Sequence, residues 1–265
     1  MHKNTKLPEN IEKLLEGKEY QIDDIGKSDS QVMIFSDSVL KIVKYRSENE
    51  EVVRMLRWIE GKLPVPKVIC YEKDENFQYL LMSKVTGVMS CDDYYMSHPD
   101  KLMPLLAEAI NMLQSVDVSD CRRDCSLDVL IKEARFRVKE GLVDTSDAEP
   151  ETYGDGGFKD PEELLEWLEN NRPEYEPSLV HGDLCLPNIF FDNDKVSGFI
   201  DTGGMGVGDK WQDIALCYRS LVHNANGVYG GKVYPGIDPE SLFEHLGIDP
   251  DWDKIRYYIL LDELF

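Results

Sequence analysis

Residues 181–188 hold the residue types and the spacing best suited to chemistry. Asp183 stands five positions before Asn188, and Asp201 follows further along the chain. Phosphoryl transfer to a hydroxyl needs a carboxylate that accepts or orients the hydroxyl proton, and hard oxygen ligands that hold Mg²⁺ against the phosphates. Asp183 suits the first role, whereas Asn188 and Asp201 suit the second. Loop Asp and Asn residues more often cap turns, so the ordered set carries the prediction rather than any one member.

Two short apolar runs separate Asn188 from Asp201. The runs 189–191 and 196–200 flank Asn193 and Asp194, which predicts a β-hairpin with a turn at its tip. Antiparallel strands would bring Asn188 and Asp201 side by side. A kinase catalytic loop has the same Asp-x-x-x-x-Asn spacing with a magnesium-binding Asp further on. The pattern therefore predicts a phosphotransferase.

A lysine in an apolar strand is the candidate cation. Lys41 lies within the run 39–43, where a charged side chain is costly unless it is paired. Phosphate groups and a carboxylate on the following helix would pair it, and the alternative is a lysine on an edge strand that faces solvent. Gly26 and Ser28 lie in a stretch of small residues that would let backbone N–H groups approach phosphates, unless this is a plain turn.

The elements that must position these residues divide the chain into two parts. Short β-rich runs with one helix occupy the first part, and a mostly helical pattern begins after about residue 86. Such segregation predicts an α+β fold with two lobes and a cleft between them. We expect an N-terminal nucleotide-binding lobe over residues 1–85 and a C-terminal catalytic and substrate-binding lobe over residues 86–265.

The apolar spacing predicts individual helices and their buried faces. The predicted helices are 8–17, 48–60, 102–116, 126–140, 161–170, 211–223, 239–245 and 251–265. The first would bury Ile11, Leu14 and Leu15. The second would bury Val52, Met55, Leu56 and Ile59. Asp160 followed by Pro161 is a typical helix start.

Composition limits the partners. The net charge of −22, from 51 acidic and 29 basic residues, repels nucleic acid and anionic membranes, although acidity also serves solubility alone. The apolar runs are too short to span a bilayer, and the N-terminus does not resemble a signal peptide. We expect a cytoplasmic protein, a monomer or weak dimer, with no nucleic-acid or membrane partner.

Several stretches resemble the aminoglycoside phosphotransferases, in particular the 3′-phosphotransferase branch. The resemblance is carried by residues 58–68, 80–83 with Gly87, 158–161, 180–188, 196–201, 209–220 and 251–265. It implies a bilobal protein-kinase-like fold with a small β-rich N-lobe and a larger, mainly helical C-lobe. It also implies transfer of the γ-phosphate of ATP or GTP to an aminoglycoside hydroxyl, with the 3′-hydroxyl as the leading acceptor, and hence antibiotic resistance.

The same resemblance implies roles for individual residues. Asp183 would be the catalytic base, and Asn188 and Asp201 would bind Mg²⁺. On the nucleotide side, the implied contacts are Lys41 with the α/β-phosphates, Ser28 in the phosphate loop, and backbone groups of Ser83 and Val85 with the nucleobase. The acceptor's ammonium groups would be held by acidic groups at Glu149, Glu151, Asp155, Asp262, Glu263 and the carboxylate of Phe265.

The chain departs from the family pattern on the nucleotide side. Val39 replaces an aromatic residue that stacks on adenine in some relatives, and Val52 stands where the glutamate partner of Lys41 is expected. Glu51 is our candidate for that partner, with Glu48 as the alternative.

Two further departures lie near the acceptor. Gly204 replaces an arginine near the active site. An acidic residue is common after Arg219 and Ser220, but here the chain reads Leu221-Val222-His223-Asn224, and the Gly-rich insertion 225–236 comes next. A kinase of another small amino-alcohol or sugar metabolite, and a catalytically weak nucleotide-binding regulator, therefore remain alternatives.

Overall fold

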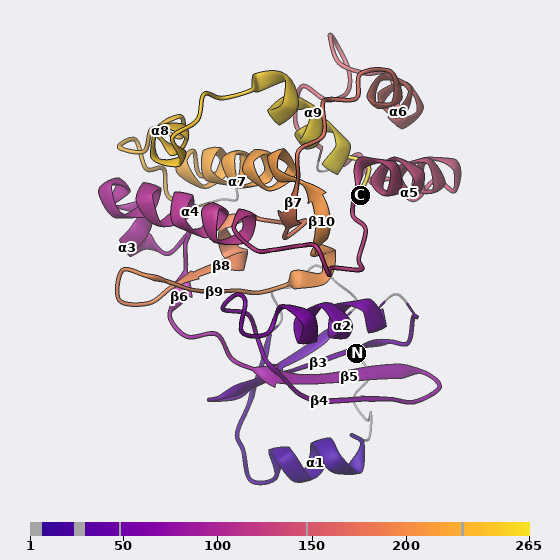
Figure 1. The fold of residues 1–265 in the computed structure, drawn as a ribbon, viewed down its shortest axis with the longest axis vertical. Coiled ribbons are helices and arrows are strands. Elements are labelled where there is room, and N and C mark those ends of the chain that lie inside the picture. Colours follow the sequence, from indigo (N-terminus) through magenta and orange to yellow (C-terminus); the bar gives the residue numbers. More distant parts are fainter. Residues whose placement is uncertain (1–6, 24–29, 48, 147, 229–230) are drawn as a thin grey trace. The chain divides into compact units, whose positions relative to one another are not determined.

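The chain combines a strand-rich part with a mostly helical part, as expected for an α+β fold (Figure 1). The computed structural model describes residues 7–23, 30–47, 49–146, 148–228 and 231–265. Two compact units are present, Met1–Thr86 with Ser197–Ile200, and Gly87–Val196 with Asp201–Phe265. No helix among the described residues is both long enough and apolar enough to cross a bilayer.

The first unit is built on an antiparallel sheet. In spatial order its strands are β1 (Gln21–Asp23), β2 (Gln31–Ile34), β3 (Ser38–Lys44), β5 (Phe77–Ser83) and β4 (Val68–Lys73). Side chains alternate between the two faces of a strand, so Leu40 and Ile42 lie on one face of β3 and Lys41 lies on the other. Leu40 and Ile42 belong to the same buried cluster as Ile11 and Leu15 of α1 (Glu9–Leu15). Because β3 lies between β2 and β5, the edge-strand alternative for Lys41 is wrong.

Two predicted helix faces differ from the structure by one residue. Leu14 of α1 is 45% exposed rather than buried. In α2 (Asn49–Ile59) the buried residues are Val53, Met55, Leu56 and Ile59, so Val53 takes the place predicted for Val52. Neighbouring residues on a helix lie about 100° apart, and apolar side chains at both positions leave the rotation to be decided by tertiary packing.

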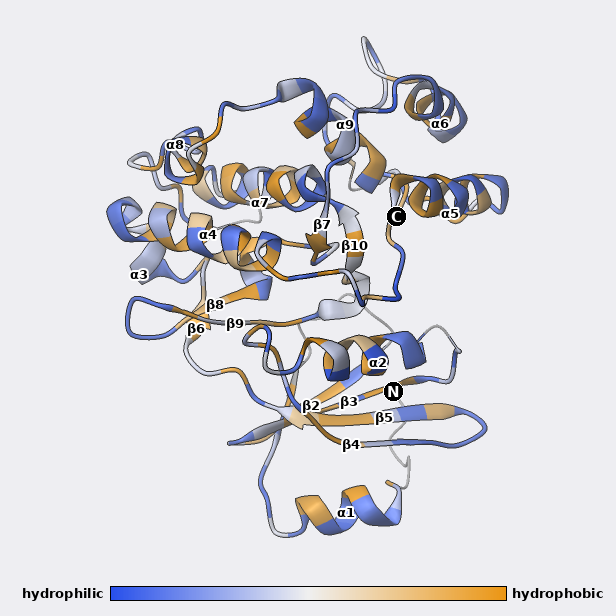
Figure 2. Cartoon of the chain, viewed as in Figure 1, coloured by the Kyte–Doolittle hydropathy of each residue, from blue (hydrophilic) through white to orange (hydrophobic). Residues whose placement is uncertain are grey.

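The second unit contains most of the helices. They are α3 (Asp93–Met96), α4 (Pro99–Gln114), α5 (Leu127–Lys139), α6 (Pro161–Asn170), α7 (Lys210–Ala225), α8 (Ser241–Leu246) and α9 (Trp252–Asp262). Helix α7 packs against α9, α4 against α8, and α5 against α6. Apolar stretches recur along α4 and α7 in Figure 2, and Ile214, Cys217 and Leu221 of α7 are buried. The predicted N-cap at Asp160 is confirmed, since its side chain accepts a hydrogen bond from Glu163 N.

Short strands deliver the two loops that carry the candidate site. Strand β7 (Pro177–Val180) pairs antiparallel with β10 (Gly206–Asp209), with Val180 opposite Gly206. The segment that begins at His181 therefore starts beside the segment that ends at Met205. Strand β8 (Ile189–Phe191) pairs with β6 (Val88–Met89), and the expected turn before β9 (Val196–Phe199) is closed by backbone hydrogen bonds between Asp192 and Lys195.

A close backbone contact joins these two loops. Gly182 has a φ of +86°, and a Cβ atom at this position would lie 2.6 Å from the carbonyl oxygen of Gly204. Position 182 requires glycine because of its positive φ and because a Cβ atom would not fit against the backbone of Gly204. The contact places the loop that contains Asp183 against the loop that follows Asp201.

We expect Gly182→Ala to lower the free energy of unfolding by more than Gly156→Ala does. Gly156 has a similar φ of +90°, but a Cβ added there would have no atom within 4 Å. The Gly156→Ala variant therefore measures the backbone conformational cost alone, about 1–2 kcal/mol. The clash with Gly204 adds roughly 1–3 kcal/mol. Urea unfolding of both variants measures the difference, and equal losses would show that the contact contributes nothing.

Candidate active site

Asn188 orients the carboxylate of Asp183. Asp183 is exposed, whereas Asn188 is buried in the short 3₁₀ turn Leu186–Asn188. The Asn188 Nδ2 group donates to the backbone oxygen of Asp183 at 2.9 Å and to its Oδ2 at 3.0 Å. The five-residue spacing thus folds the amide back onto the carboxylate. Oδ2 of the Asp183 carboxylate is therefore fixed by Asn188.

Asp201 is held in an unusual backbone conformation. Its φ of 55° and ψ of 46° place it in the left-handed region, immediately before the 3₁₀ turn Thr202–Gly204. For a residue with a Cβ this conformation costs on the order of 1–3 kcal/mol, and such residues are concentrated at functional sites. The side chain is exposed. Asp183 and Asp201 therefore lie on loops that the Gly182–Gly204 contact brings together.

Arg123 fixes the loop after Asp201, a role that the sequence did not indicate. Its Nη2 donates to the carbonyl oxygen of Gly203 at 2.6 Å, from a position 80 residues earlier in the chain. Its backbone also joins β10, because Val207 N donates to Arg123 O at 2.9 Å. Gly204 stands where relatives have an arginine, and in this chain the guanidinium of Arg123 reaches the same loop from another segment.

A buried carboxylate holds the start of the loop that contains Asp183. Asp213 of α7 is 3% exposed and accepts hydrogen bonds from His181 N at 2.6 Å and Gly182 N at 3.0 Å. Burial raises the pKa of Asp213 to about 6, although His181 and the two amides oppose the rise. The role of Asp213 was not predicted from the sequence. Its signal was an acid in the middle of an apolar helical stripe, which is costly unless paired.

Ser220 holds the same loop two helical turns further along α7. Its hydroxyl accepts a hydrogen bond from Leu186 N at 3.0 Å. Seven residues are close to two full turns, so Asp213 and Ser220 lie on one face of the helix. Asn224 continues this face and donates to the backbone oxygen of Ser220 at 2.8 Å. One rigid helix therefore fixes both ends of the segment that contains Asp183.

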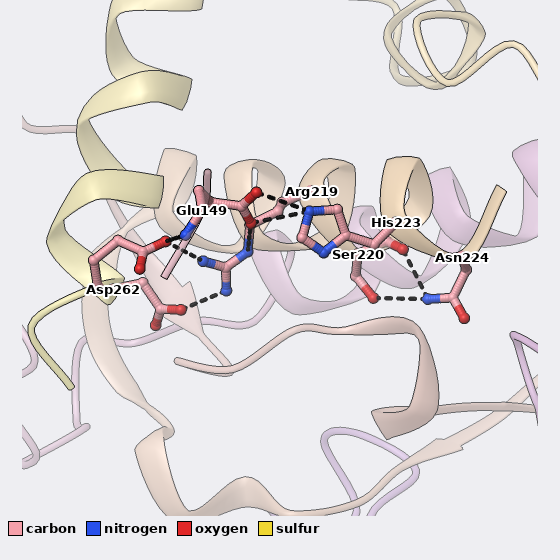
Figure 3. Close-up of polar contacts among 7 residues, drawn as sticks. Glu149, Arg219, Ser220, His223, Asn224 and Asp262 are labelled. Atoms are coloured by element: carbon pink, nitrogen blue, oxygen red, sulfur yellow. Dashed lines mark hydrogen bonds and ion pairs between the residues drawn. The ribbon is translucent and has the colours of Figure 1, made fainter. Parts of the chain in front are cut away.

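Three acidic side chains gather around Arg219 on a neighbouring stripe of α7 (Figure 3). The Arg219 guanidinium forms an ion pair with Asp262, and its nitrogens lie 3.8 Å from Glu263 Oε1 and 3.9 Å from Glu149 Oε1. The backbone N–H of Glu149 also donates to Glu263 Oε1 at 3.3 Å. The structure therefore brings Glu149 together with Asp262 and Glu263, although 114 residues separate Glu149 from Glu263.

The acids of this cluster titrate differently. Burial raises the pKa of Glu263 to about 7 and also raises that of Asp262, with Arg219 opposing both shifts. Asp183 contributes to the raised pKa of Asp262, so the two carboxylates are near enough to repel each other. A hydrogen bond from His223 lowers the pKa of Glu149. The cluster is thus electrostatically coupled to Asp183.

The remaining acceptor candidates have other surroundings. Glu151 and Asp155 are exposed on the loop that follows Glu149. Phe265 is 45% exposed, and Arg137 of α5 donates to a main-chain oxygen of Phe265 at 2.5 Å and to Leu264 O at 2.8 Å. The chain end is therefore anchored by an arginine that the sequence analysis did not single out.

The nucleotide-side candidates belong to the first unit. Lys41 lies opposite Val32 and Leu80 in the sheet. The N–H group of Ser83 donates to Lys67 O at 2.9 Å, and the N–H group of Lys67 donates to the Ser83 hydroxyl at 2.9 Å.

The other candidates of this unit are partly described. The side chain of Val85 lies beside Gly198. Glu51 forms an ion pair with Arg54. Gly26, Ser28 and Glu48 lie outside the described residues, so the identity of the Lys41 partner stays a prediction.

The sequence and the fold agree on a family. The sequence model of the phosphotransferase enzyme family matches residues 28–254. The chain is 42% identical to an aminoglycoside 3′-phosphotransferase of Enterococcus faecalis over 242 residues, which cover 91% of this chain and 87% of that protein. A second such enzyme, from Staphylococcus aureus, is 41% identical over 91% of this chain and 88% of its own.

Solved structures show the same fold. An aminoglycoside phosphotransferase from Streptomyces rimosus superposes with a TM-score of 0.81 at 23% identity, covering 96% of this chain and 95% of that one. A structure of the same enzyme in complex with ADP and streptomycin has a TM-score of 0.75 at 24% identity and covers 92% of each chain. The site is that of a small-molecule phosphotransferase. The chain belongs to the phosphotransferase enzyme family, alongside the aminoglycoside 3′-phosphotransferases.

The raised pKa of Asp213 predicts a specific pH dependence of stability. Between about pH 4 and pH 6 the folded state binds the Asp213 proton more tightly than the unfolded state, whose aspartates titrate near 3.9. Tighter proton binding by Asp213 therefore raises the free energy of unfolding by its full amount below about pH 4. This gain, on the order of 3 kcal/mol, is lost as pH rises through about 6.

We expect Asp213→Asn to flatten this part of the stability curve. Urea unfolding at about pH 4.5 and pH 7 measures it, and Asp253→Asn on the exposed side of α9 is the control that should keep the wild-type slope. An Asp213→Asn slope equal to that of wild type would contradict the assignment.

Proposed function

We propose that this chain transfers the γ-phosphate of ATP to a hydroxyl of an aminoglycoside, with the 3′-hydroxyl as acceptor, and so confers resistance. The observation that carries the proposal is the pairing of an oriented catalytic carboxylate, Asp183, with the cation-binding cluster of Glu149, Asp262 and Glu263. The activity named for the relatives, and the ADP and streptomycin bound by one structural neighbour, support this choice of substrates.

In this proposal Asp183 acts on the acceptor hydroxyl. Its Oδ1 accepts the hydroxyl proton as the acceptor oxygen bonds to the γ-phosphorus and the bond to the bridging oxygen of ADP breaks. Asn188 keeps the carboxylate in one orientation throughout. Glu149, Asp262 and Glu263 would bind the acceptor's ammonium groups and thereby place its hydroxyl beside Asp183.

The residues present fit a magnesium ion that arrives with the nucleotide. Because Nδ2 of Asn188 faces Asp183, the Oδ1 atom of Asn188 is turned away from Asp183. Hard cations prefer oxygen ligands, so this Oδ1 suits Mg²⁺. No group of three or more His, Cys, Asp or Glu within the described ranges is arranged to hold a metal. Mg²⁺ commonly takes only one or two carboxylates together with phosphates and water, which suits Asp201 and Asn188. Bound there, the ion would offset phosphate charge.

We assign nucleotide binding to the first unit. Lys41 would contact the α/β-phosphates, Gly26 and Ser28 would approach them through backbone groups, and Ser83 and Val85 would face the base. Glu51 or Glu48 would pair with Lys41. GTP is the alternative phosphate donor. We further propose that the protein acts in the cytoplasm, where the nucleotide is available, as a monomer or weak dimer.

Asp183→Asn should abolish transfer while leaving nucleotide binding near the wild-type level. General-base assistance contributes ~10²–10⁴-fold, and asparagine cannot accept the proton. Turnover with kanamycin and neomycin is measured by ADP release and by mass change of the acceptor, with Asp253→Asn as the control. A variant that keeps more than about a tenth of wild-type turnover would remove Asp183 from this role. The proposed function itself fails if wild type phosphorylates no aminoglycoside with either ATP or GTP.

Asp201→Ala should weaken Mg²⁺-dependent nucleotide binding more than Asn188→Ala does. A carboxylate brings charge to the ion, whereas an amide brings only a dipole. Calorimetric titration of nucleotide with and without Mg²⁺ measures both effects. Binding by Asp201→Ala that matches wild type in both conditions would exclude Asp201 as a magnesium ligand.

A further inference from the structure

His223 engages one of the three carboxylates proposed for the acceptor. Its Nε2 lies 2.9 Å from Oε1 and 3.0 Å from Oε2 of Glu149, so one ring nitrogen faces both oxygens (Figure 3). The side chains of His223 and Glu149 are only 16% and 25% exposed. His223 lies one helical turn after Arg219, and both point to the same acidic cluster. The protein therefore supplies this cluster with two basic side chains of its own.

The two basic side chains are not equivalent toward Glu149. Arg219 is in direct contact with Asp262 and approaches Glu149 only to 3.9 Å. His223 makes the short contact and covers both carboxylate oxygens. An incoming ammonium group can use Glu149 fully only by displacing this imidazole or by sharing the oxygens with it.

We propose that His223 is a specificity-determining residue that withholds Glu149 from the acceptor's amines. An imidazole N–H occupies acceptor positions on the carboxylate, and a protonated ring also cancels its charge. The site therefore binds amine-rich acceptors less tightly than its three acids would allow. This inference rests on the proposed function, because it assigns the cluster to an aminoglycoside.

A competing role for His223 predicts the opposite result. If His223 served to orient Glu149 toward the acceptor, its removal would weaken binding, as the loss of a positioning hydrogen bond does. The sign of the change in acceptor affinity on removal of the ring therefore separates the two roles.

The test is a double-mutant cycle on His223 and Glu149. His223→Leu replaces the ring by an apolar side chain, and Glu149→Gln removes the carboxylate charge. Calorimetry measures the Kd for neomycin, and steady-state kinetics measure KM and kcat for neomycin, for kanamycin, which carries fewer amines, and for ATP. His245→Gln, at an exposed position of α8, is the control.

We expect His223→Leu to bind neomycin roughly 10-fold more tightly than wild type, with a smaller gain for kanamycin and an unchanged KM for ATP. The gain should vanish in the double variant, because Glu149 is then absent. His223→Gln, which keeps a donor but never carries charge, should give an intermediate gain and replaces His223→Leu if the latter does not fold.

Unchanged or weaker neomycin binding in His223→Leu would overturn the inference, as would a gain that persists with Glu149→Gln. If wild type phosphorylates aminoglycosides and the variants show no gain, the inference alone fails. If neither wild type nor the variants bind any aminoglycoside, the inference and the proposed function fail together.

Discussion

The hydrogen bonds from His181 and Gly182 to the buried carboxylate of Asp213 are the interaction on which the rest of the candidate site depends. They fix the point where β7 ends and the loop that contains Asp183 begins. A buried acid without partners costs several kcal/mol, so its two amide donors cannot be given up without loss of local structure. The position of Asp183 therefore depends on a buried residue of α7.

Helix α7 holds both the segment that contains Asp183 and the acidic cluster around Arg219. One stripe of its surface carries Asp213 and Ser220, which hold the loop that contains Asp183. A stripe about 100° away carries Arg219 and His223, which hold Glu149, Asp262 and Glu263. Because a helix is stiff, these two sets of contacts keep a fixed spacing. Substitutions that shift α7 would disturb Asp183 and the cluster together.

Local patterns pointed to the Asp183–Asn188 segment and to most helices, whereas the contacts that were missed are long-range. The roles of Asp183, Asn188 and Asp201 stay predictions. The Asp183–Asn188 spacing and the apolar periodicity of most helices are local, and both predicted real features. Arg123 reaches Gly203 across 80 residues, and no local pattern signals such a contact. Strands β7 and β10 are too short to show a period of two. The one-residue rotation of α2 was decided by packing, which the sequence alone does not contain.

The overall charge of −22 says little about binding, whereas the local balance of charge says more. The pKa of Glu149 is lowered, which means that His223 and its other neighbours already satisfy its negative charge. The pKa values of Asp262 and Glu263 are raised, so burial outweighs the positive charge that Arg219 supplies to them. An acceptor ammonium placed between these two groups would favour their ionised forms. His223 therefore balances the charge of Glu149, whereas burial still disfavours the ionised forms of Asp262 and Glu263 despite the ion pair between Arg219 and Asp262.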